Sequence, residues 1–402
     1  MFGSHRGKTI GRWSLAALCA AWALVTGLTC AWGQQEPDTT ALLQQGDAAV
    51  ASGDLSQAEG FYLKALAQRP RLWPVYRVVA DFYAVAQRDC ARAIPYYEVY
   101  FEHAAVPGGE GHMEALDNAL MCHVKIENWD RAIEIAEASW RLMRDRSAHA
   151  QARIMLRRRG ELELRAGRYE KALATFQKVL LDDFGDVHAQ LMRAHTRYYL
   201  GQYDKALEEY RYIQRSFERG QLAFVNLYIG TVLTMLERHG EALEALRMSV
   251  EVDGEHPQTY WWMARCHQET GNNFMAERAY RRSLELSRLV ADTELLNSTR
   301  NNLAWLIILR SRPGAPELLE ALSLVRQAVE DTRGQEATYC DTMAEVHLRL
   351  GNHDRALRWS QQALRLSPGD PYLQKQVRRI ERYSQGFESP GGRVRLERWR
   401  EP

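Results

Sequence analysis

The sequence lacks the patterns that mark common metal, nucleotide and nucleophile sites. Its six cysteines are too scattered to form a CxxC pair or a cluster with histidine, which argues against a zinc site. It has no Gly-rich phosphate loop, HExxH motif or nucleophile–base pair. We therefore expect no cofactor, no metal and no enzymatic activity. An unrecognised active site grafted onto the fold is the alternative, because a fold alone does not exclude catalysis.

Proline and an excess of one charge are also scarce. The 402 residues include 12 prolines, and 52 basic side chains face 51 acidic ones, for a formal charge of +1. This balance gives no reason to expect nucleic acid or an anionic membrane as a partner. An apolar fraction of 46% with 26% charged residues is typical of a chain that folds. A body rich in Ala, Leu, Glu and Arg favours helix.

The first 33 residues differ from the rest. An uncharged run from Trp13 to Gly33 follows three basic residues, Arg6, Lys8 and Arg12. The run has an apolar centre, and small residues stand at Ala31 and Gly33, as a signal-peptide cleavage site requires. Residues 1–33 are thus predicted to be a signal peptide that exports the chain to the periplasm or cell envelope of a bacterium. An uncleaved membrane anchor is the alternative, because the run approaches spanning length.

The remaining chain repeats itself in steps of 34 to 40 residues. In each repeat a position that is usually Gly or Ala is followed, twelve to seventeen residues later, by alanine. Because antiparallel helices approach closely only where crossing residues are small, the pattern predicts paired helices. The nine pairs are Gly46/Ala58, Ala80/Ala93, Leu120/Ala132, Gly160/Ala172, Ala194/Ala206, Gly230/Ala242, Ala264/Ala276, Ala304/Ala321 and Ala344/Ala356. A bulky residue, such as Phe176, often stands four positions after the alanine.

Two repeats depart from the pattern. In the third, Leu120 replaces the small residue and Ala136 replaces the bulky one, which indicates a compensating exchange of size. The second has one extra residue near Asp89 and Cys90. Several turns carry a glycine, as in Ala166-Gly-Arg168, and this residue accepts the left-handed conformation that closes a helix.

The stretches Gly160–Phe176 and Ala344–Leu357 resemble tetratricopeptide repeats closely. The resemblance covers residues 39–370 and implies an all-α fold, a right-handed α-solenoid of about nine helical hairpins. Residues 371–384 are predicted to form a capping helix, which such an array needs over its last apolar face. Residues 385–402, with four arginines and the run Ser389-Pro-Gly-Gly392, are expected to be a disordered basic tail.

The resemblance also implies a function: a scaffold that holds a partner peptide or protein in a groove lined by the first helices of the hairpins. Aromatic anchors and mixed charge on that face suit a peptide. The alternative is that these side chains only pack against neighbouring hairpins. The candidates are His188, His195, Tyr198, Tyr199, Phe224, Trp261, Arg265, Asn301 and Trp305. The two histidines lie seven residues apart, which is wider than usual helical metal-site spacing and favours a solvated or hydrogen-bonding role.

An arginine-rich run extends from Arg141 to Arg168. One interpretation is a site for an anionic non-protein ligand such as a polysaccharide or a lipid headgroup. Its central candidates are Arg153, Arg157, Arg158 and Arg165. The other interpretation is that two helix faces are solvated and balanced by acids of neighbouring hairpins.

Four cysteines follow the predicted signal peptide. Cys90 is expected to begin one helix and Cys122 to lie late in the next, antiparallel one. Their ends meet, so a disulfide is geometrically possible. Two buried free thiols are the alternative. Cys266 and Cys340 are expected to be thiols of the core.

Overall fold

The computed structural model describes residues 37–103, 110–145, 148–216, 222–310 and 313–385. These residues form helices and short connections, and no strand occurs among them. The all-α prediction is therefore confirmed. No helix within the described ranges has the length and apolar character needed to cross a bilayer. The predicted signal peptide and the basic tail beyond residue 385 lie outside these ranges.

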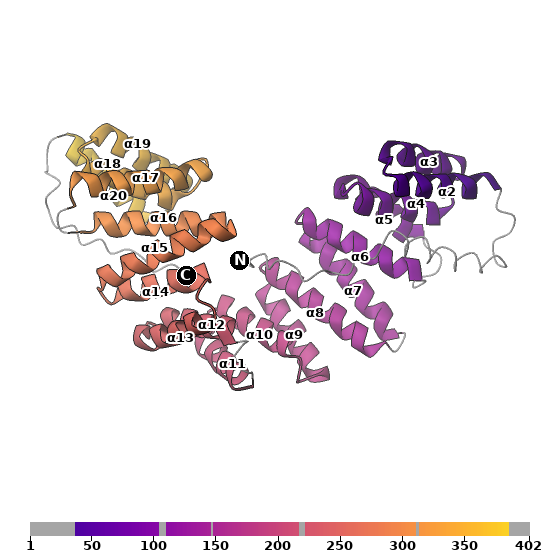
Figure 1. The fold of residues 1–402 in the computed structure, drawn as a ribbon, viewed down its shortest axis with the longest axis horizontal. Coiled ribbons are helices and arrows are strands. Elements are labelled where there is room, and N and C mark those ends of the chain that lie inside the picture. The colour runs from indigo at the N-terminus through magenta and orange to yellow at the C-terminus, as the bar shows by residue number, and fades with distance from the viewer. Residues whose placement is uncertain (1–36, 104–109, 146–147, 217–221, 311–312, 386–402) are drawn as a thin grey trace. The chain divides into compact units, whose positions relative to one another are not determined.

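The chain divides into two compact units, one ending at Glu209 and one beginning at Tyr210. In the N-terminal unit, consecutive helices pair into hairpins (Figure 1). Its helices are α2 (Pro37–Ser52), α3 (Leu55–Gln68), α4 (Trp73–Asp81), the π-helix η2 (Phe82–Ala86), α5 (Cys90–His103), α6 (Glu110–Lys125), α7 (Trp129–Asp145), α8 (His149–Arg165), α9 (Tyr169–Asp182) and α10 (Val187–Tyr199). The division falls within α11 (Tyr203–Ser216).

The C-terminal unit repeats the same hairpin (Figure 1). Its helices are α12 (Leu222–Met235), α13 (His239–Val252), α14 (Pro257–Glu269), α15 (Asn273–Val290), α16 (Thr293–Ile308), α17 (Ala315–Asp331), α18 (Ala337–Arg349), α19 (His353–Leu366) and α20 (Pro371–Ser384). The pairs α12–α13, α14–α15, α16–α17 and α18–α19 are hairpins, and α20 packs on α19.

The alanine of every repeat lies at a helix contact. All nine have no exposed surface: Ala58, Ala93, Ala132, Ala172, Ala206, Ala242, Ala276, Ala321 and Ala356. Where the first helix carries glycine, the bulky residue of the second helix fills the space above it. A Cβ on Gly160 would lie 2.8 Å from the ring of Phe176, and Gly230 is covered in the same way by Leu246. The small position therefore accommodates the bulky residue as well as the alanine.

The third hairpin reverses this arrangement. Leu120 of α6 is 1% exposed, and Ala136 of α7 is fully buried. Both positions belong to the core, with the large side chain contributed by the first helix instead of the second. The buried pair is consistent with the exchange of size predicted from the sequence.

The extra residue of the second repeat corresponds to a local change of helix type. Residues Phe82–Ala86 form a π-helix directly after α4. One added residue can be absorbed by a wider helical turn, while the helices before and after it keep their contacts. The extra residue was predicted near Asp89 and Cys90, whereas the π-helix that accommodates it lies several residues earlier in the chain.

The turns between paired helices require a left-handed residue. Glycine supplies it at Gly53, Gly167, Gly201, Gly271 and Gly351, with φ between +69° and +83°. Arg88, Glu127 and Glu237 occupy left-handed turn positions in other hairpins, at φ of 57° or 58°. These side chains make the turn less favourable than glycine would, by about 1 kcal/mol each.

The last helix is attached by both apolar and ionic contacts. Leu373 and Ile380 of α20 are almost fully buried. Glu345 of α18, only 2% exposed in its side chain, accepts a hydrogen bond from Arg379 of α20 and another at 3.0 Å from Arg349 Nε. A buried carboxylate needs such partners to offset the loss of water. Helix α20 therefore occupies the place predicted for the cap.

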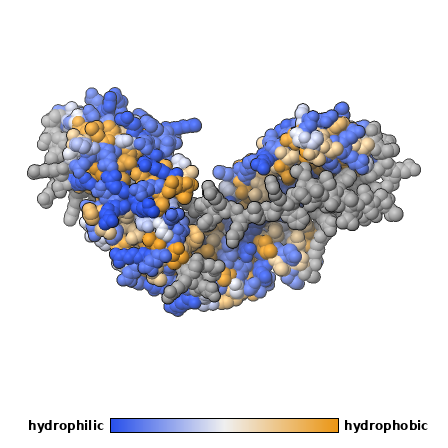
Figure 2. Space-filling model, in the orientation of Figure 1, coloured by the Kyte–Doolittle hydropathy of each residue, from blue (hydrophilic) through white to orange (hydrophobic). Residues whose placement is uncertain are grey.

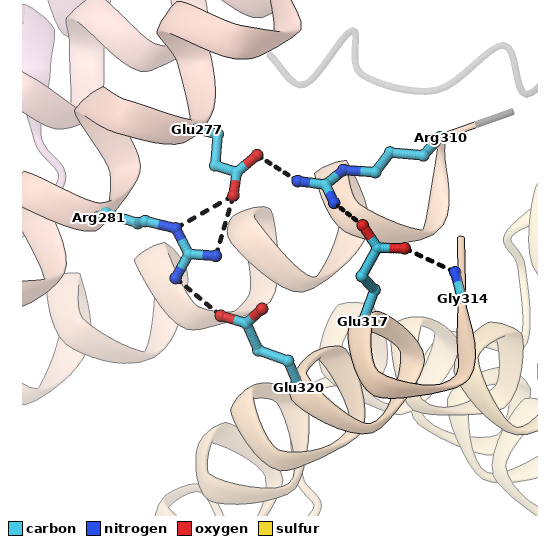
Figure 3. A network of polar contacts seen from close by, with 6 residues as sticks. All are labelled: Glu277, Arg281, Arg310, Gly314, Glu317 and Glu320. Atoms are coloured by element: carbon cyan, nitrogen blue, oxygen red, sulfur yellow. Dashed lines mark hydrogen bonds and ion pairs between the residues drawn. The ribbon is translucent and has the colours of Figure 1, made fainter. Parts of the chain in front are cut away.

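A second ionic network joins the second helices of neighbouring hairpins (Figure 3). Glu277 of α15 accepts bonds from Arg281 at 2.9 Å and from Arg310 at the end of α16. Arg281 also reaches Glu320 of α17 at 2.7 Å, and Arg310 pairs with Glu317. Burial raises the pKa of Glu277, but the bonds from both arginines outweigh it and leave the pKa below its ordinary value. The network connects α15 with α17, both directly and through Arg310, which follows α16.

Candidate functional site

A cavity of about 330 Å³ opens on the first helices of three successive hairpins in the C-terminal unit. Helices α14 and α16 supply most of its wall, and the start of α18 completes it. Four of the predicted groove residues line it together: Trp261, Arg265, Asn301 and Trp305. The remaining lining residues are Gln258, Trp262, Gln268, Glu269, Tyr280, Leu295, Ser298, Asn302, Glu336, Thr338 and Tyr339.

The periodicity of α14 explains how its side chains reach one wall. Gln258, Trp261, Arg265 and Gln268 recur at helical spacing and share a face of the helix. The two indoles of Trp261 and Trp262 meet edge to face, with ring centroids 4.9 Å apart. The Arg265 guanidinium carbon lies 5.4 Å from the centre of the Trp261 ring, within range of a cation–π contact.

Arg265 keeps its charge available. No ion pair or side-chain hydrogen bond engages this arginine within the described part of the chain. The carboxylates of Glu269 and Glu336 also line the cavity. The wall thus combines aromatic surface with charges of both signs.

Two polar atoms at the cavity lack hydrogen-bond partners. The indole Nε1 of Trp261 and the Oδ1 of Asn301 are both buried, and neither has a partner among the described residues. Asn301 is 1% exposed, and its Nδ2 donates to Asn302 Oδ1 at 3.3 Å. An unsatisfied buried polar atom costs about 1–3 kcal/mol. Both residues line the same cavity, so a ligand that enters it could supply the missing partners after small side-chain movements.

Two of the aromatic residues that line the cavity are also buried in the core. Trp305 is 2% exposed, and Tyr280 of α15 is 1% exposed. The Tyr280 hydroxyl donates to Gln268 Oε1 at 3.1 Å, and burial raises the pKa of the phenol, which therefore stays neutral. These contacts fix Gln268 on the wall and give the site a rigid base.

Surface hydrophobicity alone does not mark the site. Figure 2 shows hydrophobic and hydrophilic residues interspersed over the visible face of the C-terminal unit. Phe274 of α15 is 70% exposed outside the cavity, whereas the aromatic residues of the cavity are largely covered. The site is distinguished by its hollow and by its unsatisfied polar atoms.

The other predicted groove residues do not join this cavity. His188 of α10 lies 2.7 Å from Glu161 Oε1 of α8, and Tyr199 stacks on Tyr169 with ring centroids 5.3 Å apart. Tyr198 lies against Tyr199 and Tyr203 near the turn. All belong to the N-terminal unit. Phe224 of α12 meets the His256 ring edge to face at 5.4 Å. These residues therefore contact side chains of their own or of neighbouring hairpins.

His195, another predicted groove residue, is buried and does not line this cavity. Its side chain is 7% exposed, and its Nδ1 donates to the Leu191 carbonyl oxygen at 3.0 Å. Burial lowers the pKa of the imidazole to about 4, so the side chain is neutral at physiological pH.

The arginine run is largely neutralised inside the N-terminal unit. Arg153 pairs with Asp183 at 3.3 Å, Arg157 with Asp186 at 3.0 Å and Arg158 with Asp117 at 3.2 Å. Arg141, Arg144, Arg159 and Arg168 are also paired with acids, whereas Arg165 is exposed. Several acids come from neighbouring hairpins, as the second interpretation of this run expected. The pairing removes most of the positive field that an anionic ligand would need.

Cys90 and Cys122 form a disulfide, with Cα atoms 4.9 Å apart. It connects the first residue of α5 with the last turns of α6, where the two helices meet. Cys266 and Cys340 are free and buried. Burial raises the pKa of both thiols, that of Cys340 to about 11. Both are therefore poor nucleophiles.

Sequence reasoning missed part of the cavity. Trp262, Ser298, Asn302 and Tyr339 line it but were not among the candidates. Ser298 lies three residues before Asn301 and Asn302 four residues after Ser298, so helical spacing from Asn301 could have found both. The described residues hold no group of three or more His, Cys, Asp or Glu side chains placed to bind a metal ion.

Comparison with known families identifies several of these hairpins as tetratricopeptide repeats. Residues 122–186 and 191–259 match one description of the tetratricopeptide repeat, and residues 337–370 match another. The chain therefore carries tetratricopeptide repeats in both units. No curated protein matches the sequence.

Solved structures show the same fold at low sequence identity. The chain is similar to the hetero-tetramer Cut9–Hcn1 of the APC/C, at 14% identity and a TM-score of 0.52, over 91% of this chain and 82% of that one. It also resembles a tetratricopeptide repeat protein from Parabacteroides merdae, at 17% identity and a TM-score of 0.49, over 67% and 98%. The pilus biogenesis factor PilW is 22% identical, with a TM-score of 0.47, over 56% and 98%.

Proposed function

We propose that the chain is a non-enzymatic scaffold that binds a partner protein through an extended peptide segment in the cavity of α14, α16 and α18. The supporting observation is the pair of unsatisfied atoms, Trp261 Nε1 and Asn301 Oδ1. One is a donor and the other an acceptor. A peptide group offers the complementary set, because its carbonyl accepts and its N–H donates. Tetratricopeptide repeats in general serve protein–protein interaction.

The remaining wall suits the side chains of such a segment. The indole of Trp261 provides the kind of aromatic anchor that often dominates an interface. Arg265 can pair with an acidic side chain, and Glu269 or Glu336 with a basic one, which would set the register of the peptide. The cavity volume of about 330 Å³ accommodates part of a segment and not a folded domain.

A photo-crosslinking residue in place of Gln258 would test the proposal in the full chain. The same residue in place of Phe274, which is exposed on α15, is the matched control. We expect a protein adduct at position 258 that is missing at position 274. Adducts of equal yield at both positions would count against a peptide site in the cavity.

Variants of the wall then measure its contribution to the captured partner. Trp261→Ala and Asn301→Ala should each weaken binding, by about 2 kcal/mol for the tryptophan. Phe274→Ala should leave binding unchanged. Circular dichroism must show that each variant is folded. Equal affinity of all three variants would refute the assignment.

We further propose that the chain is exported to the bacterial cell envelope. The basic and apolar pattern of residues 1–33 supports export, and so does the Cys90–Cys122 disulfide, because disulfides persist in oxidising compartments. Mass spectrometry of the protein from fractionated cells tests both parts. A first residue of Gln34 in the envelope fraction is expected, whereas an intact N-terminus would indicate the membrane anchor and a cytoplasmic location would contradict export.

A further inference from the structure

A second cavity, of about 750 Å³, lies between the second helices of the last two hairpins. Helix α17 forms one side, α19 the other, and α18 lies between them. It shares no lining residue with the cavity of α14 and α16. The lining residues include five arginines: Arg326, Arg333, Arg355, Arg358 and Arg365.

The charge of this cavity is not compensated from within. Arg326, Arg333, Arg355 and Arg358 are exposed, and their side chains form no ion pair or hydrogen bond within the described residues. This contrasts with the run from Arg141 to Arg168, where acids neutralise nearly every guanidinium. Glu330 is the one acidic residue that lines the cavity. One carboxylate does not balance five guanidinium groups, so most of their mutual repulsion is relieved by solvent, salt or a bound anion.

His347 provides a second, independent indication of a ligand. This histidine of α18 lines the cavity and is 5% exposed, and its Nδ1 has no hydrogen-bond partner among the described residues. Burial, followed by repulsion from Arg355, Arg326 and Arg358, lowers the pKa of the imidazole. In the tautomer that carries hydrogen on Nδ1, the imidazole of His347 can donate a hydrogen bond to a carboxylate oxygen of a ligand.

Apolar groups complete the wall. Val329, Met343 and Trp359 line the cavity between the charged positions. A small inorganic anion such as phosphate would pair with the arginines but would leave the apolar side chains of the cavity in contact with water. A neutral sugar polymer would leave the charges of the arginines without a counter-charge. An acidic peptide that also carries an apolar side chain matches both parts of the lining. Its carboxylates can pair with the arginines, and its apolar side chain can pack on Val329, Met343 and Trp359.

We propose that the α17–α19 cavity is a second binding site, specific for an acidic peptide segment with an apolar anchor residue. Guanidinium forks of Arg355, Arg358 and Arg326 pair with carboxylates of the segment. The anchor lies against Trp359 and Met343. The chain would then hold two segments at once, one on its first helices and one on its second helices.

The proposal can be tested with the full chain and a short fluorescent peptide of alternating glutamate and leucine. Fluorescence anisotropy should show saturable binding that weakens as salt rises. Arg355→Glu/Arg358→Glu should reduce the affinity by roughly tenfold or more. The matched control is Arg278→Glu/Arg288→Glu, which makes the same change of charge at exposed arginines of α15 and should retain binding. Arg326→Gln/Arg333→Gln, a milder change on the opposite side, should also weaken binding.

Three results would overturn the proposal. Equal loss in the Arg355/Arg358 variant and the control would show a nonspecific effect of charge. Equal binding of a glutamine–leucine peptide would show that the carboxylates are not recognised. Arginine-dependent binding of inorganic phosphate or phosphatidylglycerol vesicles, without binding of the acidic peptide, would assign the cavity to a different ligand. Trp261→Ala should leave the peptide affinity unchanged, which separates this site from the proposed function.

Discussion

The ring of Phe176 occupies the space that a side chain on Gly160 would need, with Cε1 2.8 Å from the ideal Cβ position of that glycine. Replacing the glycine by alanine adds helix propensity, which is worth about 1 kcal/mol. The methyl group must also displace a fully buried ring, and such overpacking costs about 1–3 kcal/mol. In this contact the clash outweighs the gain.

We therefore predict that Gly160→Ala destabilises the N-terminal unit by up to about 2 kcal/mol, as measured by urea unfolding. Gly60→Ala is the matched control, because Gly60 is also helical but has no atom within 4 Å of the added methyl group. It should stabilise the same unit by about 0.5–1 kcal/mol. Equal effects of the two substitutions would contradict the packing argument.

The third hairpin suggests a second substitution that should restore stability to a Gly160 variant. Leu120 and Ala136 show that the large side chain can come from the first helix. The double variant Gly160→Leu/Phe176→Ala should be more stable than Gly160→Leu alone, because the leucine then occupies the volume left by the ring. A double variant no better than the single one would show that the exchange depends on the local backbone of the third hairpin.

The buried His195 should make stability depend on acidity. Its pKa is about 4 in the folded protein and about 6.5 when exposed, so between these values the unfolded chain binds a proton that the folded chain does not. Stability therefore falls as the pH drops from about 6.5 to 4, by about 3 kcal/mol. Urea unfolding at several pH values should show this loss, and His195→Gln should lessen it. An imidazole that titrates near 6.5 in an NMR experiment would contradict the prediction.

Alkylation should distinguish the four cysteines of the described chain. Denatured but unreduced protein that begins at Gln34, and so lacks Cys19 and Cys30, is expected to take two labels, on Cys266 and Cys340, and the same protein after reduction four. Folded protein should label slowly, because both free thiols are buried. Loss of the disulfide, which joins residues 32 positions apart, should destabilise the fold by about 3 kcal/mol. Four labels without reductant would rule out the bond.

The ion pair between Arg379 and Glu345 should hold the last helix in place. Arg379→Ala leaves the buried carboxylate with only Arg349, and we expect a loss of about 1–3 kcal/mol. Hydrogen exchange should then increase in α20 before the rest of the C-terminal unit. Arg378→Ala is the control, since Arg378 is exposed beside it and should change stability by less than about 0.5 kcal/mol.

The spacing of small residues was enough to predict the hairpins. All nine repeat alanines are buried as expected, because close helix crossing leaves no other choice at those positions. The cavity could be predicted in part: Trp261 and Arg265 share a helix face by spacing alone, and Asn301 lies at the corresponding place in the next first helix. Helical periodicity does not show how far each side chain is covered by a neighbour. Periodicity therefore did not anticipate the burial of His195.

Electrostatic sites were harder to predict, because their partners are distant in sequence. The acid that neutralises Arg158 lies 41 residues earlier, and the one that neutralises Arg157 lies 29 residues later. Conversely, the arginines of the α17–α19 cavity are spread over two helices and a turn among ordinary polar residues. A dense run of one charge in the sequence proved to be compensated, and a dispersed set proved to be exposed around a cavity.

The bond between Cys90 and Cys122 also limits how far the chain can be stretched. When both ends are pulled apart, the residues between the two cysteines remain a closed loop, even after every helix has unfolded. Because the two cysteines are 32 positions apart in the sequence, the closed loop removes roughly 110 Å of extended length. A reducing agent would release that length in one step. Optical tweezers should therefore record two contour lengths for the unfolded chain, set by the redox state of a single bond.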